Sequence, residues 1–236
     1  MANHAVAMSH GPIEEIVDDV FWVQGSVQLA PGMRLTRNMV IVRNGEELVV
    51  VSPVRLSAAG EAELEKLGTV HHVVKIGFMH GMDDAYYLER FGATYWALPD
   101  GARPEDPTPD EKLSEGSLPI PDAELFEFLD TQNKEGALLI ARGGGILITC
   151  DSVQHWNNTK GCSLPAKLAA HLIGFLRRPA QIGPPWRKRM TPAGGSLKSD
   201  FERLTQLEFV HMIGAHGHPL RETAKEDLTA TVEATF

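Results

Sequence analysis

The chain has 236 residues, of which 43% are apolar and 22% charged, and its formal net charge is −9. This composition is typical of a soluble globular protein that is long enough to bury a full hydrophobic core. An acidic protein is a poor match for a nucleic-acid backbone or an anionic membrane, so we expect neither as a partner. The basic run Arg187-Lys188-Arg189 is too short to change this, and we interpret it as a solvated loop.

The cysteines and the N-terminal residues indicate where the protein resides. Residues 1–11 lack the basic and apolar regions of a secretory signal, and no apolar run reaches the ~20 residues of a membrane span. Cys150 and Cys162 do not form a metal-type Cys-x-x-Cys pair. Two thiols in a chain without an export signal are usually free. We therefore expect a cytoplasmic protein without a disulfide.

Short β-branched runs, turn residues and helix-terminating glycines predict a mixed order of strands and helices. Strands are expected at 21–23, 39–42, 48–51, 70–76, 94–97, 125–129, 137–141, 146–150 and 209–213, and helices at 57–67, 83–91, 165–176, 197–207 and 222–234. Asn44-Gly45 is a hairpin-turn signal between the second and third strands. Segments 99–121 and 179–195 are rich in Pro and Gly, so we expect irregular loops there, the second of them near a site.

This order of elements favours an α/β protein of layered type, an αββα four-layer sandwich in which two sheets pack face to face between helices. The sequence contains neither an internal repeat nor a low-complexity tract. We expect residues 1–236 to form a single domain. A homodimer is the default assembly, although no segment identifies an interface.

The loop after the strand predicted at 70–76 carries the most informative pattern. It contains His80-Gly81-Met82-Asp83-Asp84-Ala85, in a strand–loop–helix setting that commonly presents metal ligands. The spacing His80-x-Met82-x-Asp84-Ala85 resembles the His-x-His-x-Asp-His signature of metallo-β-lactamase-fold hydrolases, with two histidines missing. Segments 34–45, 52–54 and 67–74 resemble an uncharacterised branch of that superfamily, and the resemblance extends over most of the chain. It implies the αββα sandwich.

The resemblance also implies which ligand positions remain. Of the seven in the family pattern, four are kept, namely His80, Asp84, Asp151 and His216. Asp151 lies in a segment that matches the family's Thr-Gly-Asp, with Cys150 in place of Gly, and His216 lies in a match to its C-terminal Gly-His-Gly. Met82, Ala85 and Asn133 stand where the family carries histidines. The sequence leaves open whether His155 or His218 replaces a missing imidazole.

The reduced ligand set implies one divalent ion at most, and a metal-free site is the alternative. We predict His80, Asp84, Asp151 and His216 as metal ligands, with His80 and Asp84 as the catalytic residues. Two carboxylates and one imidazole are enough for a catalytic Zn²⁺ that keeps a bound water, and such a set also suits Fe²⁺ or Mn²⁺.

Each predicted ligand also has a purely structural interpretation. A single loop histidine commonly bonds to a carboxylate, Asp83 and Asp84 suit a helix N-terminus, and Asp151 suits a turn. Their joint occurrence in the expected chain order is what favours a site. Two hypotheses follow: a mononuclear metal-dependent hydrolase acting on a small molecule through a metal-activated water, or a metal-free protein that binds a small molecule or a protein partner in the same cleft.

Overall fold

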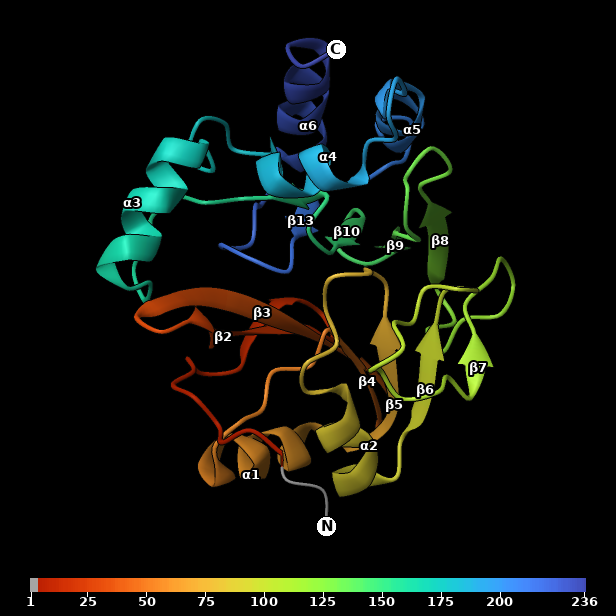
Figure 1. Ribbon diagram of the computed structural model, residues 1–236. Helices are drawn as coiled ribbons and strands as arrows, with labels where there is room; N and C mark the ends of the chain where they lie inside the picture. Colours follow the sequence, from red (N-terminus) through yellow and green to blue (C-terminus); the bar gives the residue numbers. More distant parts are fainter. Residues whose placement is uncertain (1–3) are drawn as a thin grey trace.

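The computed structural model describes residues 4–236 and contains two large β-sheets between layers of helices (Figure 1). The first sheet follows the sequence order from β1 to β7. Its strands are β1 (Glu14–Val17), β2 (Val20–Ala30), β3 (Met33–Asn44), β4 (Glu47–Val51), β5 (Thr69–Lys75), β6 (Thr94–Ala97) and β7 (Glu111–Lys112). The first four strands pair antiparallel, and β4 to β7 pair parallel.

The second sheet has the strand order β13-β10-β9-β8, in which β10 and β13 are parallel neighbours. Its strands are β8 (Ala123–Glu127), β9 (Gly136–Ile140), β10 (Ile146–Thr149) and β13 (His211–Ile213). A separate pair is formed by β11 (Val153–Gln154) and β12 (Gln181–Ile182). Because β10 and β13 run in the same direction, their carboxyl ends lie together at one edge of the sheet.

Helices cover the outer faces of both sheets (Figure 1). The first sheet is covered by α1 (Ala58–Leu67) and α2 (Asp84–Phe91), and the second by α4 (Pro184–Met190), α5 (Lys198–Leu204) and α6 (Ala224–Glu233). α3 (Leu164–Ile173) stands apart, at the edge of the molecule beside β3. None of the helices in residues 4–236 has both the length and the apolar character needed to cross a bilayer.

The strands distribute their side chains between three apolar layers. Along β4, Val49 and Val51 face the second sheet, while Leu48 and Val50 face α1 and α2. The residues of β10 alternate in the same way between the inter-sheet core and the layer under α4 to α6. A period of two sends successive side chains to opposite faces, so a strand covered on both faces is apolar throughout. These layers form the predicted αββα sandwich.

The structure differs from the sequence prediction in two loops. Residues 187–189, expected in a solvated loop, lie in α4, because Trp186 and Met190 are one helical turn apart and both are buried under the second sheet. The basic side chains between them point outward. The segment 99–121 was expected to be irregular, but it contributes the two-residue edge strand β7.

Candidate metal centre

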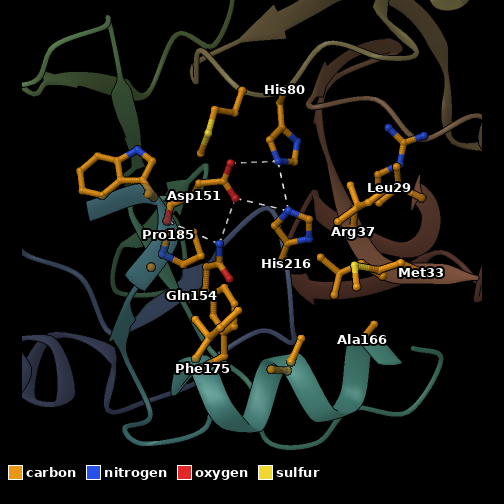
Figure 2. Close-up of a pocket in the computed structure, with 18 of the residues that line it drawn as sticks. Leu29, Met33, Arg37, His80, Asp151, Gln154, Ala166, Phe175, Pro185 and His216 are labelled. Carbon is orange, nitrogen blue, oxygen red and sulfur yellow. Dashed lines mark hydrogen bonds and ion pairs between the residues drawn. The ribbon is translucent and has the colours of Figure 1, made fainter. Parts of the chain in front are cut away.

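Three side chains from three strand-ending loops converge at one edge of the sandwich (Figure 2). His80 follows β5 of the first sheet, Asp151 follows β10, and His216 follows β13. Asp151 and His216 are neighbours because β10 and β13 are parallel and end together. His80 approaches them from the other sheet. The structure thus brings three of the four predicted ligands together.

The three side chains form a small triangle in which each histidine faces a different oxygen of Asp151. The Nε2 atoms of His80 and His216 are 3.2 Å apart. His80 Nε2 is 3.3 Å from Asp151 Oδ2, and His216 Nε2 is 3.3 Å from Asp151 Oδ1. In a tetrahedral zinc site with bonds of about 2.0–2.1 Å, neighbouring ligand atoms are separated by about 3.3–3.4 Å. The two imidazoles therefore have the spacing of neighbouring tetrahedral ligands, and each is at a similar distance from a different oxygen of Asp151.

The tautomer of His216 directs a lone pair into this triangle. Its Nδ1 is 2.5 Å from the carbonyl oxygen of Thr36. A carbonyl only accepts, so in the neutral imidazole the proton lies on Nδ1 and the Nε2 lone pair faces Asp151 and His80. Metal-binding histidines usually donate their second ring nitrogen to a carbonyl or carboxylate in this way. His216 is therefore already oriented as a ligand.

Asp151 is held by a chain of directed hydrogen bonds. The indole Nε1 of Trp156 can only donate, and it donates to Gln154 Oε1 at 2.9 Å. This fixes the amide of Gln154, whose Nε2 then donates to Asp151 Oδ1 at 3.0 Å. The chain leaves Asp151 Oδ2 facing His80. Carboxylate ligands in metal sites are commonly oriented by such outer hydrogen bonds.

The electrostatics of the triangle favour a cation. Burial lowers the pKa of His80, with Asp151 opposing the shift, so this imidazole favours its neutral, metal-binding form. Burial alone would raise the pKa of Asp151, but the neighbouring His80 and His216 outweigh it and hold that pKa below its usual range. An ionised carboxylate thus faces two imidazole nitrogens within 3.3 Å. A proton or a metal ion between these atoms would satisfy all three.

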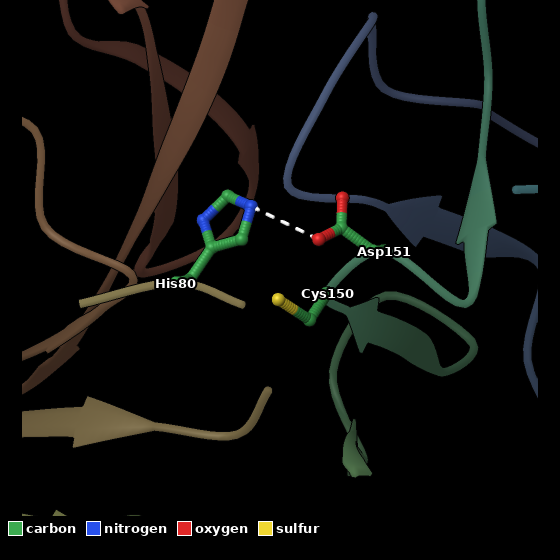
Figure 3. Close-up of side chains that lie close together, drawn as sticks. All are labelled: His80, Cys150 and Asp151. Atoms are coloured by element: carbon green, nitrogen blue, oxygen red, sulfur yellow. Dashed lines mark ion pairs between the residues drawn. The ribbon is translucent and has the colours of Figure 1, made fainter. Parts of the chain in front are cut away.

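Cys150 adds a sulfur beside the triangle. Its Sγ and one ligand atom each of His80 and Asp151 lie within 4.8 Å of one another, a cluster that could hold a metal ion (Figure 3). The thiol is fully buried, and burial together with Glu135 and Asp151 raises its pKa well above the usual value. A thiol binds metal as the thiolate, so this environment disfavours Cys150 as a ligand relative to the imidazole of His216.

Asp84 lies in a different environment from the other predicted ligands. Its carboxylate accepts a hydrogen bond of 2.6 Å from the hydroxyl of Tyr95. Nearby, Lys75 pairs with Asp106 at 3.2 Å and donates to the carbonyl oxygen of His80. The side chains of Lys75 and Asp106 are 2% exposed, and Asp84 is 1% exposed. Asp84 as a metal ligand or catalytic residue stays a prediction, and its contacts favour a role in supporting the His80 loop.

The remaining candidates from the sequence have other contacts. His155 Nδ1 lies 2.8 Å from the carbonyl oxygen of Pro179, and the ring of His218 packs near Trp22. Asn133 donates to the sulfur of Met190. Met82 is 60% exposed at the rim of the site. His155 thus bonds outside the triangle, whereas His218 has this ring contact and a buried Nδ1 without a hydrogen-bond partner among residues 4–236.

Sequence reasoning missed the groups that orient the ligands. The carbonyl of Thr36 has no side-chain signature, and Gln154 is two residues from its partner Trp156 without any known motif. Lys75 did leave a signal, since it is the only charged residue in the otherwise apolar run 73–76. A charge within a buried strand generally requires a buried partner. The partner, Asp106, lies in a loop whose path the sequence does not give.

The triangle lies in the wall of a pocket of about 320 Å³ that is mostly apolar (Figure 2). Its apolar walls come from the β2–β3 hairpin, the His80 loop, α3 and the start of α4, and include Leu29, Met33, Ala169, Phe175 and Trp186. Polar groups are few and converge on one side, around the triangle and Arg37. This combination of apolar walls and a few convergent polar groups is typical of small-molecule sites.

Comparisons with solved structures identify this architecture. The DIM-1 metallo-β-lactamase matches with a TM-score of 0.63 at 10% identity, over 95% of this chain and 97% of that one. FIM-1 from Pseudomonas aeruginosa, in a mono-zinc form, matches with a TM-score of 0.61 at 15% identity, over 95% and 96%. The chain has the metallo-β-lactamase fold. A metallo-β-lactamase from Erythrobacter litoralis matches with a TM-score of 0.55 at 11% identity, over 94% and 92%.

These likenesses establish the fold alone, because all three sequence identities are far below those of close relatives. No protein-family model matches the sequence. No curated protein matches it either. What the metallo-β-lactamase fold does in this chain must therefore be argued from its own residues.

Proposed function

We propose that this protein is a mononuclear metal-dependent hydrolase whose metal ion is held by His80, Asp151 and His216. The observation that carries the proposal is the triangle, in which the side chains of three separate loops approach one another to within 3.2–3.3 Å. Two imidazoles and one carboxylate form a ligand set of catalytic zinc sites, and the set also suits Fe²⁺. The mono-zinc form of the structurally similar FIM-1 is consistent with a single ion.

A divalent ion in this position would lower the pKa of a water molecule and supply a nucleophile near neutral pH. The residues of the chain have defined parts in that reaction. His216, through Thr36, and Asp151, through Gln154, keep their ligand atoms aimed at one point. The apolar walls exclude water around the substrate and strengthen the electrostatic interactions inside the pocket.

The reaction class is hydrolysis of an ester, thioester, amide or phosphoester of a small molecule. The pocket of about 320 Å³ is at the lower end of the usual range for ligand sites. Because its walls are mostly apolar, the part of the substrate enclosed there should be apolar as well.

The test begins with protein from which metal has been removed by a chelator. Zn²⁺, Fe²⁺ or Mn²⁺ is then added, and hydrolysis of chromogenic esters, thioesters, amides and phosphoesters is measured. We expect activity only after an ion is added, and none in Asp151→Ala. Binding of less than about a tenth of an equivalent of each ion, with no rise in melting temperature, would contradict the proposal, because a ligand of the folded state must stabilise it. That result would favour the metal-free binding protein.

A further inference from the structure

The helix α3 exposes its large apolar side chains and buries its small ones. Leu164, Leu168 and Leu172 are 80%, 62% and 72% exposed. Ala166 and Ala170, on the inner side, are 3% and 2% exposed. Residues four apart share one face of a helix, so the three leucines form a continuous stripe that points away from the protein. A surface helix normally has the opposite orientation.

The stripe is flanked by positive charge. Lys160 and Arg34 lie at the N-terminal end of α3, where Arg34 Nε donates to the carbonyl of Gly161, and Arg177 and Arg178 follow its C-terminal end. Lys167 lies within the helix. Between residues 4 and 236, none of these five side chains forms an ion pair, whereas Arg37, Arg43, Arg90, Arg103, Arg142 and Arg203 all do.

The local charge is opposite to that of the whole protein. Residues 152–183, which include α3 and both of its ends, contain no Asp or Glu but four Lys or Arg residues, although the chain as a whole has a net charge of −9. The net charge led to the expectation that an anionic membrane is not a partner. An anionic surface, however, interacts with the charges nearest to it, because salt screens those beyond roughly 10 Å. The relevant charge is therefore that around α3, and it is positive.

We propose that α3 and its basic flanks form a docking surface for an anionic lipid bilayer. The leucine stripe would enter the boundary between headgroups and acyl chains, and the flanking cations would contact the anionic headgroups. A second copy of the chain fits this surface less well. In a twofold dimer the same patch meets itself, so the unpaired cations of one copy would face those of the other.

The position of the surface relates it to the pocket. The inner side of α3 lines the pocket through Ala166, Ala169, Ala170 and Ile173, as Figure 2 shows for Ala166. Leu29, Met82 and Ile173 line the pocket and are also 58%, 60% and 44% exposed. The apolar surface of α3 thus borders an apolar pocket mouth. Docking through α3 would bring that mouth next to the lipid, where apolar molecules are concentrated.

Vesicle co-sedimentation tests the proposal with the whole protein. The probes are vesicles of phosphatidylcholine alone and of phosphatidylcholine mixed equally with phosphatidylglycerol, each at about 0.1 M and about 1 M salt. We expect binding to the anionic vesicles at the lower salt concentration, strongly reduced at the higher one. Absence of that binding, or equal binding to both vesicle types, would overturn the proposal.

Variants assign the binding to the stripe and its flanks. Leu164→Ser/Leu168→Ser/Leu172→Ser should reduce binding by more than about a hundredfold, because each leucine loses its burial in lipid. Arg177→Gln/Arg178→Gln should reduce it by about thirtyfold. Leu129→Ser is the control, since Leu129 is 69% exposed in the loop after β8, and its binding should equal that of the wild type.

Two further measurements separate loss of lipid binding from misfolding and from dimer formation. Circular dichroism of the triple-serine variant should match the wild type, because it changes only exposed side chains. Sedimentation velocity without lipid should show one oligomeric state for wild type and variant. A wild-type dimer that dissociates in the triple-serine variant would assign the stripe to a second copy and overturn the lipid proposal. None of these readouts depends on metal binding or hydrolysis.

Discussion

Two polar clusters contact the loop that carries His80. In one, the charged groups pair with one another, and in the other they border the pocket. In the first, Lys75, Asp84, Tyr95 and Asp106 are buried together, and acidic and basic groups satisfy one another. In the second, His80, Asp151 and His216 border the pocket and direct lone pairs and a carboxylate at a common point. The charges of the first cluster are paired with one another, whereas the second presents its ionised carboxylate and imidazole nitrogens to the pocket.

This difference separates residues that hold a site from residues that act in it. Both clusters contain carboxylates from the same family pattern, Asp84 in one and Asp151 in the other. The surroundings, and not the residue type, decide their chemistry. Asp84 keeps a proton readily because burial raises its pKa to about 6, while the pKa of Asp151 is held low by its two histidines.

The strongest test of the comparison is removal of a carboxylate from each cluster. Asp151→Ala should raise the dissociation constant for Zn²⁺ by more than about a thousandfold, because a tetrahedral site loses a charged protein ligand. Asp84→Asn is the matched control, and its dissociation constant should stay within about threefold of the wild type. Isothermal titration with Zn²⁺ measures both. Equal losses in the two variants would mean that Asp84 is a ligand after all.

The cluster of Lys75, Asp84, Tyr95 and Asp106, called the closed cluster because its charges pair with one another, should contribute to the free energy of unfolding. Lys75→Met leaves Asp106 and Asp84 without their buried cation and removes the hydrogen bond to the His80 carbonyl. Breaking a buried ion pair in this way costs about 3–5 kcal/mol of the free energy of unfolding. Urea denaturation of metal-free protein measures it. The exposed Lys66→Met is the control, and a similar small loss in both variants would refute the assignment of a closed cluster.

The raised pKa of Asp84 predicts a pH dependence of stability. Between about pH 4 and 6 the folded protein keeps a proton that the unfolded chain has released, so its free energy of unfolding falls as the pH rises through this window. Asp84→Asn has no such proton. Relative to this variant, the wild type should lose up to about 3 kcal/mol between pH 4 and 7.

Denaturation of both proteins across that pH range provides the measurement. Glu115→Gln, which changes an exposed carboxylate, should follow the wild type at every pH. If the difference between wild type and Asp84→Asn were constant from pH 4 to 7, the environment assigned to Asp84 would be incorrect.

The smallest expected effect belongs to the group that orients Asp151. Gln154→Ala removes the amide that donates to Asp151 Oδ1 and is itself fixed by Trp156. Loss of such an outer contact typically weakens metal binding by about 10–100-fold. Zinc titration measures this, with the exposed Gln206→Ala as control. An unchanged affinity in Gln154→Ala would show that Asp151 is positioned without this chain.

The sequence allowed strands, turns and helix ends to be predicted because their signals are local, while the resemblance to metallo-β-lactamase-fold hydrolases implied how they are layered. The β-branched run of β4, the Asn44-Gly45 turn and Gly68 each act on their immediate neighbours, and the structure has the strand, hairpin and helix end there. The helix α4 was missed because Pro184 and Pro185 resemble a loop, although Pro is well accepted in the first turn of a helix.

The candidate site could be predicted only in part, because its contacts are long-range. The resemblance to the metallo-β-lactamase pattern was enough to propose Asp151 and His216 alongside His80, and the structure places the three within hydrogen-bonding range of one another. The spacing around Asp84 could not reveal that Tyr95 and Lys75 occupy its surroundings. Nor could residue types identify Thr36, which contributes only a backbone carbonyl.

The most direct test of the metal site is X-ray absorption at the edge of the metal bound by the wild-type protein. We predict one equivalent of metal with only nitrogen and oxygen neighbours at about 2.0–2.1 Å, two of them imidazole, and an identical spectrum for Cys150→Ser. A sulfur neighbour at about 2.3 Å that disappears in Cys150→Ser would contradict the account, because it would place the ion at His80, Asp151 and Cys150.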